Sequence, residues 1–113
     1  MSPITTHILD TRLGTPAAGV SIHLEKRDAV GGWHVLASGV TNADGRLANL
    51  LADGGLTKGH HRLSFDVGAY FQQQRVEHFY PQVSIEFNVA DPAAHYHVPL
   101  LLSPFGYRTY RGT

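Results

Sequence analysis

The chain contains no cysteine, and this absence removes several sources of stability and chemistry at once. Disulfide bonds, thiolate nucleophiles and cysteine-ligated zinc are excluded. No apolar run approaches the roughly 20 residues of a membrane-spanning helix. The opening Met1-Ser2-Pro3 also lacks the basic and apolar regions of a signal peptide. We therefore expect a cytoplasmic protein without a membrane partner, whose fold depends on packing alone.

Clustered charge is also lacking. Nine Lys and Arg residues balance nine Asp and Glu residues, and no run of like charge is longer than Lys26-Arg27. Nucleic acid binding requires a concentrated basic surface, so we expect no nucleic acid partner. The length of 113 residues fits one folded unit, and no linker or internal repeat divides it. We expect residues 1–113 to form a single domain.

Period-two alternation of apolar and polar residues is the dominant pattern, and it indicates half-buried strands. It is clearest in residues 20–25 and 83–89, and shorter stretches lie at 4–8, 33–37 and 63–67. Turn-forming residues separate the stretches at Gly14-Thr15-Pro16, Gly31-Gly32, Ala43-Asp44-Gly45 and Asp53-Gly54-Gly55. The sequence predicts a mainly β fold, an antiparallel β-sandwich of about seven or eight strands.

Residues 69–79 differ from the rest, because they contain no turn residue and are followed by Pro81. We predict a short helix there. One helix among many strands favours a mostly antiparallel sandwich, since parallel strands would need repeated crossover helices.

Residues 95–102 predict a strand that is apolar on both faces. One face carries Pro99 and Leu101, which a two-layer sandwich would leave exposed, so a second subunit is the simplest cover. Alternatively, Leu101 lies at a strand end or under a loop, and Pro99 favours an edge strand or a bulge. The aromatic tail, residues 105–113, is expected to dock rather than remain disordered.

The one compositional excess is histidine, with eight residues: His7, His23, His34, His60, His61, His78, His95 and His97. His95 and His97 share one face of the predicted strand, a spacing that zinc or copper can use if a third ligand such as His7 joins them. Strand pairs of this kind also occur without metal. His60 and His61 follow Lys58-Gly59, and we predict a solvated pair in a loop.

A neutral imidazole can take a proton from water near neutral pH, so paired histidines suit hydrolysis. Cleavage of an amide or lactam also requires a positive group near the developing oxyanion. Arg46 follows a turn where a strand is expected to begin, and it can supply that charge. Taken alone, Arg46 is more typical of a solvated surface arginine than of a catalytic residue.

Four segments together carry a family resemblance. These are Thr6-His7-Ile8-Leu9-Asp10, Gly14-Thr15-Pro16-Ala17, Asp44-Gly45-Arg46 and residues 95–107 (HYHVPLLLSPFGY). They resemble 5-hydroxyisourate hydrolase, the transthyretin-related family, over essentially the whole chain. The closing Tyr110-Arg111-Gly112-Thr113 is similar to the family's terminal Tyr-Arg-Gly-Ser, which the transthyretin hormone carriers lack.

The resemblance implies a transthyretin-like sandwich that forms a homotetramer, a dimer of dimers, with active sites between the dimers. It implies that His7, Arg46 and His97 are catalytic, that residues 110–113 line the pocket and bind substrate, and that no metal or other cofactor takes part. The implied reaction opens the ring of 5-hydroxyisourate with water to give 2-oxo-4-hydroxy-4-carboxy-5-ureidoimidazoline, in urate degradation. A small-molecule carrier and a metal-binding module are the alternatives.

The resemblance implies which residues form the site, but it leaves the role of each residue open. One histidine activates the water, while the other holds a substrate nitrogen or donates to the leaving group, and either can be the base. Tyr110 and Arg111 either bind substrate oxygens or seal the groove. Thr113 stands where the family has serine, so a direct role of its hydroxyl is open. A contribution of His95 is open as well.

Overall fold

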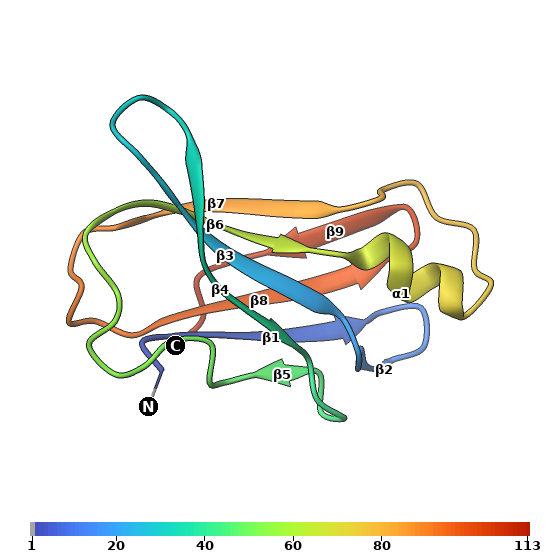
Figure 1. Cartoon of the computed structure of the whole chain (residues 1–113). Coiled ribbons are helices and arrows are strands. Elements are labelled where there is room, and N and C mark those ends of the chain that lie inside the picture. Colours follow the sequence, from blue (N-terminus) through green and yellow to red (C-terminus); the bar gives the residue numbers. More distant parts are fainter. Residues whose placement is uncertain (1) are drawn as a thin grey trace.

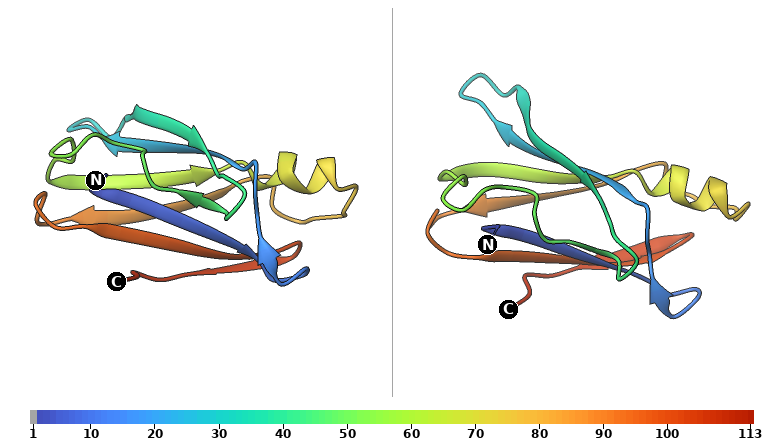
Figure 2. Two further views of the ribbon diagram at one scale, coloured as in Figure 1. Left: turned by 90° about the horizontal axis from the view of Figure 1, so that it is seen from below. Right: turned by 60° about the horizontal axis from the view of Figure 1, so that its bottom comes forward.

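The computed structural model describes residues 2–113. Within this range the chain forms nine strands and one helix: β1 (Ile4–Asp10), β2 (Thr15–Pro16), β3 (Ser21–Arg27), β4 (Trp33–Val40), β5 (Arg46–Leu47), β6 (Gly59–Phe65), α1 (Val67–Gln73), β7 (Val83–Val89), β8 (Tyr96–Ser103) and β9 (Gly106–Thr109). One sheet has the order β2-β1-β8-β9 with β5 also paired to β1, and the other has the order β4-β3-β6-β7. Figures 1 and 2 show the two sheets as layers, with α1 at one end.

The core lies between the layers and is made by strictly alternating side chains. In β1 the residues Ile4, Thr6, Ile8 and Asp10 are buried, while the residues between them are half-buried on the outer face. In β8 the inward residues are Tyr96, Val98, Leu100 and Leu102. Burying a large aliphatic side chain contributes about 1.5–3 kcal/mol, so this alternation fixes which face of each strand points outward. The predicted sandwich and its alternating strands are confirmed.

The mostly antiparallel arrangement is confirmed, with one parallel pair among the described strands. β1 and β8 lie parallel, with Ile4 beside Tyr96 and Asp10 beside Leu102. A parallel pair needs a long connection between its strands. Here the whole second sheet provides it, so no crossover helix is required. The two-residue strands β2 and β5 raise the total to nine, and they are too short to produce any alternation in the sequence.

The predicted helix exists but begins and ends earlier than expected. The Asp66 side chain caps its first turn by accepting a hydrogen bond from the backbone N–H of Ala69 at 3.3 Å. The helix ends at Gln73, and Arg75 adopts a left-handed φ of 56° shortly afterwards. Residues 74–79 contain no turn residue, and for that reason the predicted helix extended too far.

A buried carboxylate joins α1 to the first sheet. Asp10 is 0% exposed, and it accepts a hydrogen bond from the Tyr70 hydroxyl at 2.7 Å. Its other oxygen accepts from the backbone N–H groups of Arg12 and Leu13. Burial raises the pKa of Tyr70, and the hydrogen bond to Asp10 raises it further. Asp10 therefore has a structural role at the C-terminal end of β1.

The prediction for His60 and His61 is wrong. Both belong to β6, and His61 is fully buried with its ring stacked on Phe87 at a centroid distance of 5.9 Å. Its Nδ1 bonds to the Gly59 carbonyl at 3.0 Å, whereas its Nε2 has no partner among the described residues. Burial lowers the pKa of His61 and so favours the neutral ring.

The tail docks on its own chain, where it covers part of the outer face. β9 pairs with β8, and Thr109 Oγ1 donates to the Pro99 carbonyl at 2.7 Å. Pro99 is therefore buried, and it lies in a strand between two neighbours rather than at an edge. His97 faces Gly112 in the same register in which Leu100 faces Thr109. The strand pattern stops beside Pro99, which has no N–H to donate.

In the described range, no helix has the length and apolar character that a membrane crossing requires.

Candidate active site

Strand pairing brings the two histidines and the arginine together on the outer face of one sheet. β5 pairs with β1 so that Arg46 lies directly opposite His7. On the other side of β1, β8 places His97 beside Thr5. His7 and His97 are therefore two positions apart across a parallel pair, on a common face, within reach of long side chains. Three residues that are distant in the sequence form one cluster.

His97 is the most perturbed residue of this cluster. It is half-buried, and burial lowers its pKa below the ordinary value. The Arg46 guanidinium lowers the pKa further, and His95 and His7 act in the same direction. At neutral pH the ring is therefore neutral, which is the form that accepts a proton.

Hydrogen bonds hold the His97 ring from the side of β1. The Thr5 hydroxyl lies 2.9 Å from Nδ1 of His97 and 3.2 Å from Nε2 of His95. Thr5 was not among the residues selected from the sequence. Its position on the outward face of β1 was readable from the alternation, but its contact with two imidazoles was not.

The tail holds the same ring from the other side. The backbone N–H of Gly112 donates to the His97 carbonyl at 2.8 Å. A Cβ added at Gly112 would lie 2.6 Å from Cδ2 of His97, so only glycine fits this close to the ring. Gly112 thus contacts the imidazole with its backbone.

A shallow hollow of about 220 Å³ lies over this cluster. Arg46, His97 and Thr113 line it together with His95 and Thr5, and Ala48 closes one side. Arg46 and Thr113 are exposed. The hollow offers a cationic donor, a neutral imidazole and a hydroxyl to a small polar molecule, a combination suited to hydrolysis.

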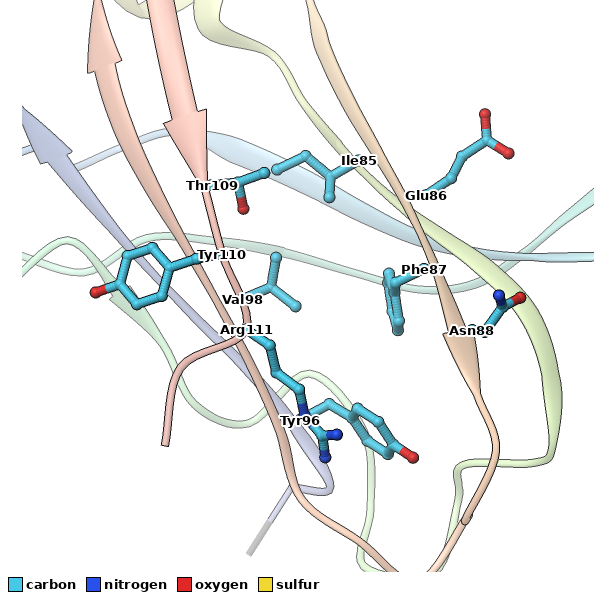
Figure 3. Close-up of a pocket in the computed structure, with 9 residues that line it drawn as sticks. All are labelled: Ile85, Glu86, Phe87, Asn88, Tyr96, Val98, Thr109, Tyr110 and Arg111. Atoms are coloured by element: carbon cyan, nitrogen blue, oxygen red, sulfur yellow. The ribbon is translucent and has the colours of Figure 1, made fainter.

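Tyr110 and Arg111 are not brought into this hollow. The Arg111 guanidinium lies 4.4 Å from the centre of the Tyr96 ring, and its Nη2 donates to the His95 carbonyl at 3.4 Å. Figure 3 shows it in a second hollow, of about 250 Å³, beside Phe87 of β7. Tyr110 also lines this second hollow, although its ring points away from Arg111 in the same view and is 55% exposed. The second hollow is lined mainly by apolar side chains and contains none of the clustered imidazoles.

The spacing of His95 and His97 in the sequence left a metal site open as an alternative. In residues 2–113, no three or more His, Cys, Asp or Glu side chains are grouped as metal ligands. The Thr5 hydroxyl lies within hydrogen-bond distance of one nitrogen of each of these imidazoles.

The fold and the cluster define a transthyretin-like β-sandwich with a polar, imidazole-bearing site on the outer face of one sheet. The HIUase/Transthyretin family profile matches residues 4–112. The chain belongs to this family.

Curated relatives cover almost the whole chain. The 5-hydroxyisourate hydrolase of Mus musculus is 42% identical over 113 residues, which covers 99% of this chain and 96% of the relative. That of Mesorhizobium japonicum is 47% identical over 115 residues, covering 97% and 91%.

Solved structures of both branches of the family resemble the chain. Sea bream transthyretin in complex with thyroxine matches with a TM-score of 0.93 and 37% identity, covering 99% of this chain and 96% of that one. The 5-hydroxyisourate hydrolase of Klebsiella pneumoniae matches with a TM-score of 0.86 and 38% identity, covering 97% and 98%. The fold is therefore common to both branches, and the site must separate them.

Proposed function

We propose that this chain is a 5-hydroxyisourate hydrolase of purine catabolism, which opens the substrate ring with water to give 2-oxo-4-hydroxy-4-carboxy-5-ureidoimidazoline. The observation that carries the proposal is the hollow lined by Arg46 and His97, with His7 opposite Arg46 on the same sheet but not among the residues that line the hollow. The names of the curated relatives supply the substrate. We take residues 1–113 as one hydrolase domain.

In the proposed mechanism His97 is the general base. Because burial and the Arg46 charge keep its pKa low, the ring is neutral at physiological pH and can remove a proton from water. Arg46 polarises the attacked carbonyl and stabilises the oxyanion. His7, opposite Arg46, holds a substrate nitrogen or donates a proton to the leaving group. No cofactor is required by these steps.

The tail residues have different roles in this proposal. Gly112 and Thr113 border the hollow, Gly112 by packing against the ring and Thr113 by offering a hydroxyl to the substrate. Tyr110 and Arg111 remain substrate-binding candidates. Since Arg111 lies over the Tyr96 ring within its own chain, its contacts favour a role in fixing the tail over direct binding.

We propose a homotetramer, a dimer of dimers, as the working form. The hollow is shallow, whereas small-molecule sites commonly enclose about 70–90% of their ligand, so a second subunit is needed to close it. The tail aromatics Phe105, Tyr107 and Tyr110 are 64%, 41% and 55% exposed in a single chain. In the described range β4, β7 and β9 each have a partner on one side only, which leaves sheet edges for pairing with another subunit. Light scattering on the purified protein tests this assembly.

We propose that the enzyme acts in the cytoplasm, a reducing compartment in which a chain without cysteine needs no disulfide bonds. Cell fractionation with an antibody to the chain tests this location.

A carrier function is the second candidate, and the TM-score of 0.93 with the thyroxine complex of sea bream transthyretin favours it. It predicts tight binding of thyroxine without turnover of 5-hydroxyisourate. Isothermal titration with thyroxine, run beside the turnover assay, separates the two candidates.

The decisive experiment follows the decay of freshly generated 5-hydroxyisourate without added metal. Wild-type protein should accelerate the decay, and His97→Ala should lower kcat/KM by about 10²–10⁴-fold. His7→Ala should also be strongly impaired. His23→Ala is the matched control, because His23 is exposed on the other sheet and bonds only to Ser38. Wild-type protein that leaves the decay rate unchanged would sink the proposal.

A further inference from the structure

A single hydroxyl joins two imidazoles beside the candidate site. Thr5 Oγ1 lies 2.9 Å from Nδ1 of His97 and 3.2 Å from Nε2 of His95. A hydroxyl has one proton, so it can donate to only one of the two rings. If it donates to His95, its lone pairs accept the N–H of His97. If it accepts from His95, its proton goes to His97. The state of one ring is therefore tied to the state of the other.

The orientation of the His97 ring shows which nitrogen faces the hollow. In an imidazole, Nδ1 and Cδ2 flank Cγ, and Nε2 is bonded to Cδ2. Thr5 contacts the Nδ1 edge of the ring, while Gly112 packs against the Cδ2 edge. Nε2 therefore lies on the side of the tail, where Thr113 lines the hollow. A base that acts on a molecule in the hollow must use Nε2.

On these contacts we propose that Thr5 and His95 form a hydrogen-bond relay that keeps the His97 proton on Nδ1 and leaves Nε2 free to accept a proton. The relay rests on the proposed hydrolase function for its role, and it identifies Thr5 as a positioning residue. Arg46 lines the same hollow, and its positive charge favours a lone pair over an N–H at the edge of the ring facing it. In this arrangement Nδ1–H of His97 donates to Thr5, and Thr5 donates to Nε2 of His95.

The relay also gives the proton a place to go. When Nε2 of His97 takes a proton from water, the proton on Nδ1 passes to Thr5 Oγ1, and the hydroxyl proton passes to Nε2 of His95. The result is one neutral His97 with its proton on Nε2, one intact hydroxyl and one cationic His95. His97 is then a donor, ready to protonate the leaving nitrogen, and the relay reverses when it does so.

The surroundings favour placing the charge on His95. His97 is half-buried and faces Arg46 and His7, both of which oppose a second positive charge there. His95 is exposed, so water stabilises its cation. Asp53 and His95 both line a third hollow, separate from the one over the cluster, whereas Arg111 donates only to the backbone carbonyl of His95. Burial and Arg46 lower the pKa of His97, in agreement with this direction of transfer.

The first test reads the tautomer directly by ¹⁵N NMR of the imidazole nitrogens in the substrate-free protein. In the wild type, Nδ1 of His97 should carry the proton and Nε2 should not. Thr5→Val keeps the shape of the side chain but removes the hydroxyl, and it should produce a mixture of tautomers. Thr5→Ser should restore the wild-type signals. If the neutral His97 ring of the wild-type protein carries its proton on Nε2, the proposal is wrong.

The second test measures kcat/KM for 5-hydroxyisourate against pH. Thr5→Val and His95→Ala should each lower kcat/KM by about tenfold or more, a part of the 10²–10⁴-fold that a general base contributes. Both variants should also change the acid limb of the profile of kcat/KM against pH. A loss of folded protein would instead lower kcat/KM at every pH. Thr11→Val is the matched control, since its hydroxyl donates only to the Leu102 carbonyl at 3.1 Å. If both variants keep wild-type profiles, the relay is wrong.

The two tests separate the relay from the function on which it rests. A wild-type protein without turnover but with His97 protonated on Nδ1 would refute the hydrolase proposal and leave the relay geometry standing. An active wild type whose Thr5→Val variant keeps both the tautomer and the rate would refute the relay alone.

Discussion

The contact between Gly112 and His97 allows a sharp prediction, because one added methyl group acts on one ring. In Gly112→Ala the new Cβ would lie 2.6 Å from Cδ2, 3.3 Å from Cγ and 3.4 Å from the carbonyl oxygen of His97. Position 112 does not have the left-handed φ that strains an alanine, so the contact is the whole effect. Either the imidazole or the tail must move.

The size of the displacement follows from ordinary packing distances. Carbon atoms in contact settle about 3.5–4.0 Å apart, so Cβ and Cδ2 must separate by about 1 Å. A misplacement of about 1 Å near reacting groups can reduce the rate about 10²-fold. We expect kcat/KM for 5-hydroxyisourate to fall by about this factor. The Tm should stay close to that of the wild type, because the tail lies at the surface and can shift without opening the core.

Gly106→Ala is the matched control. A Cβ at position 106 would meet only Ser103 Oγ, at 3.7 Å, which is an ordinary contact. This variant should keep its activity and its His97 NMR signals, whereas Gly112→Ala should alter both. Equal rates for Gly112→Ala and the wild type would refute the inference that the tail positions the ring.

Three further predictions concern charge and stability. Arg46→Gln removes a positive neighbour, so the pKa of His97 should rise in an NMR titration, and kcat/KM should fall by about 10²–10³-fold. Tyr70→Phe leaves the buried Asp10 carboxylate short of one donor and should lower the free energy of unfolding in urea by about 1–3 kcal/mol. Burial lowers the pKa of His61, so the stability that its neutral ring provides is present above the unfolded pKa of about 6.5 and is lost as pH falls. His61→Leu should therefore flatten the acid loss of stability by up to about 1.4 kcal/mol per pH unit.

Each of these predictions has an outcome that contradicts it. An unchanged His97 titration in Arg46→Gln would show that the two side chains do not interact. Tyr107→Phe is the control for Tyr70→Phe, because Tyr107 is 41% exposed; equal losses would mean that the bond to Asp10 contributes nothing. If the free energy of unfolding of His61→Leu falls with pH as steeply as that of the wild type, a group other than His61 causes the acid loss of stability.

Much of the sandwich was predictable, because a strand with one buried face must alternate. In β1 the buried positions of Ile4 and Ile8 also reveal that His7 points outward, since side chains two apart share a face. The same argument applied to β6 identifies His61 as inward, in line with Leu63 and Phe65. The preceding Lys58-Gly59 obscured this signal, because it is typical of a loop.

Pairing partners were much harder to predict than faces. That β1 lies parallel to β8 depends on how two whole sheets stack, and no local pattern records it. The position of Arg46 opposite His7 depends on a two-residue strand, which leaves no periodicity to detect. The Thr5 bridge depends on side-chain rotamers as well. The histidines and the arginine were nonetheless found, because the family resemblance supplied residues that geometry alone did not.

The parallel pairing of the first long strand with the last one has a consequence for biosynthesis. During translation β1 leaves the ribosome at the start, and its central neighbour emerges only near the end of the chain. Contacts with so large a sequence separation form late and slow the overall folding reaction. Until then β1 can pair only with the two-residue strands β2 and β5, so the edge of β1 that later meets β8 stays open, and chaperones can recognise such an edge. Chains released before residue 96 would hence lack the long partner strand of β1 as well as His97, and they should be cleared as misfolded protein rather than accumulate in an inactive folded form.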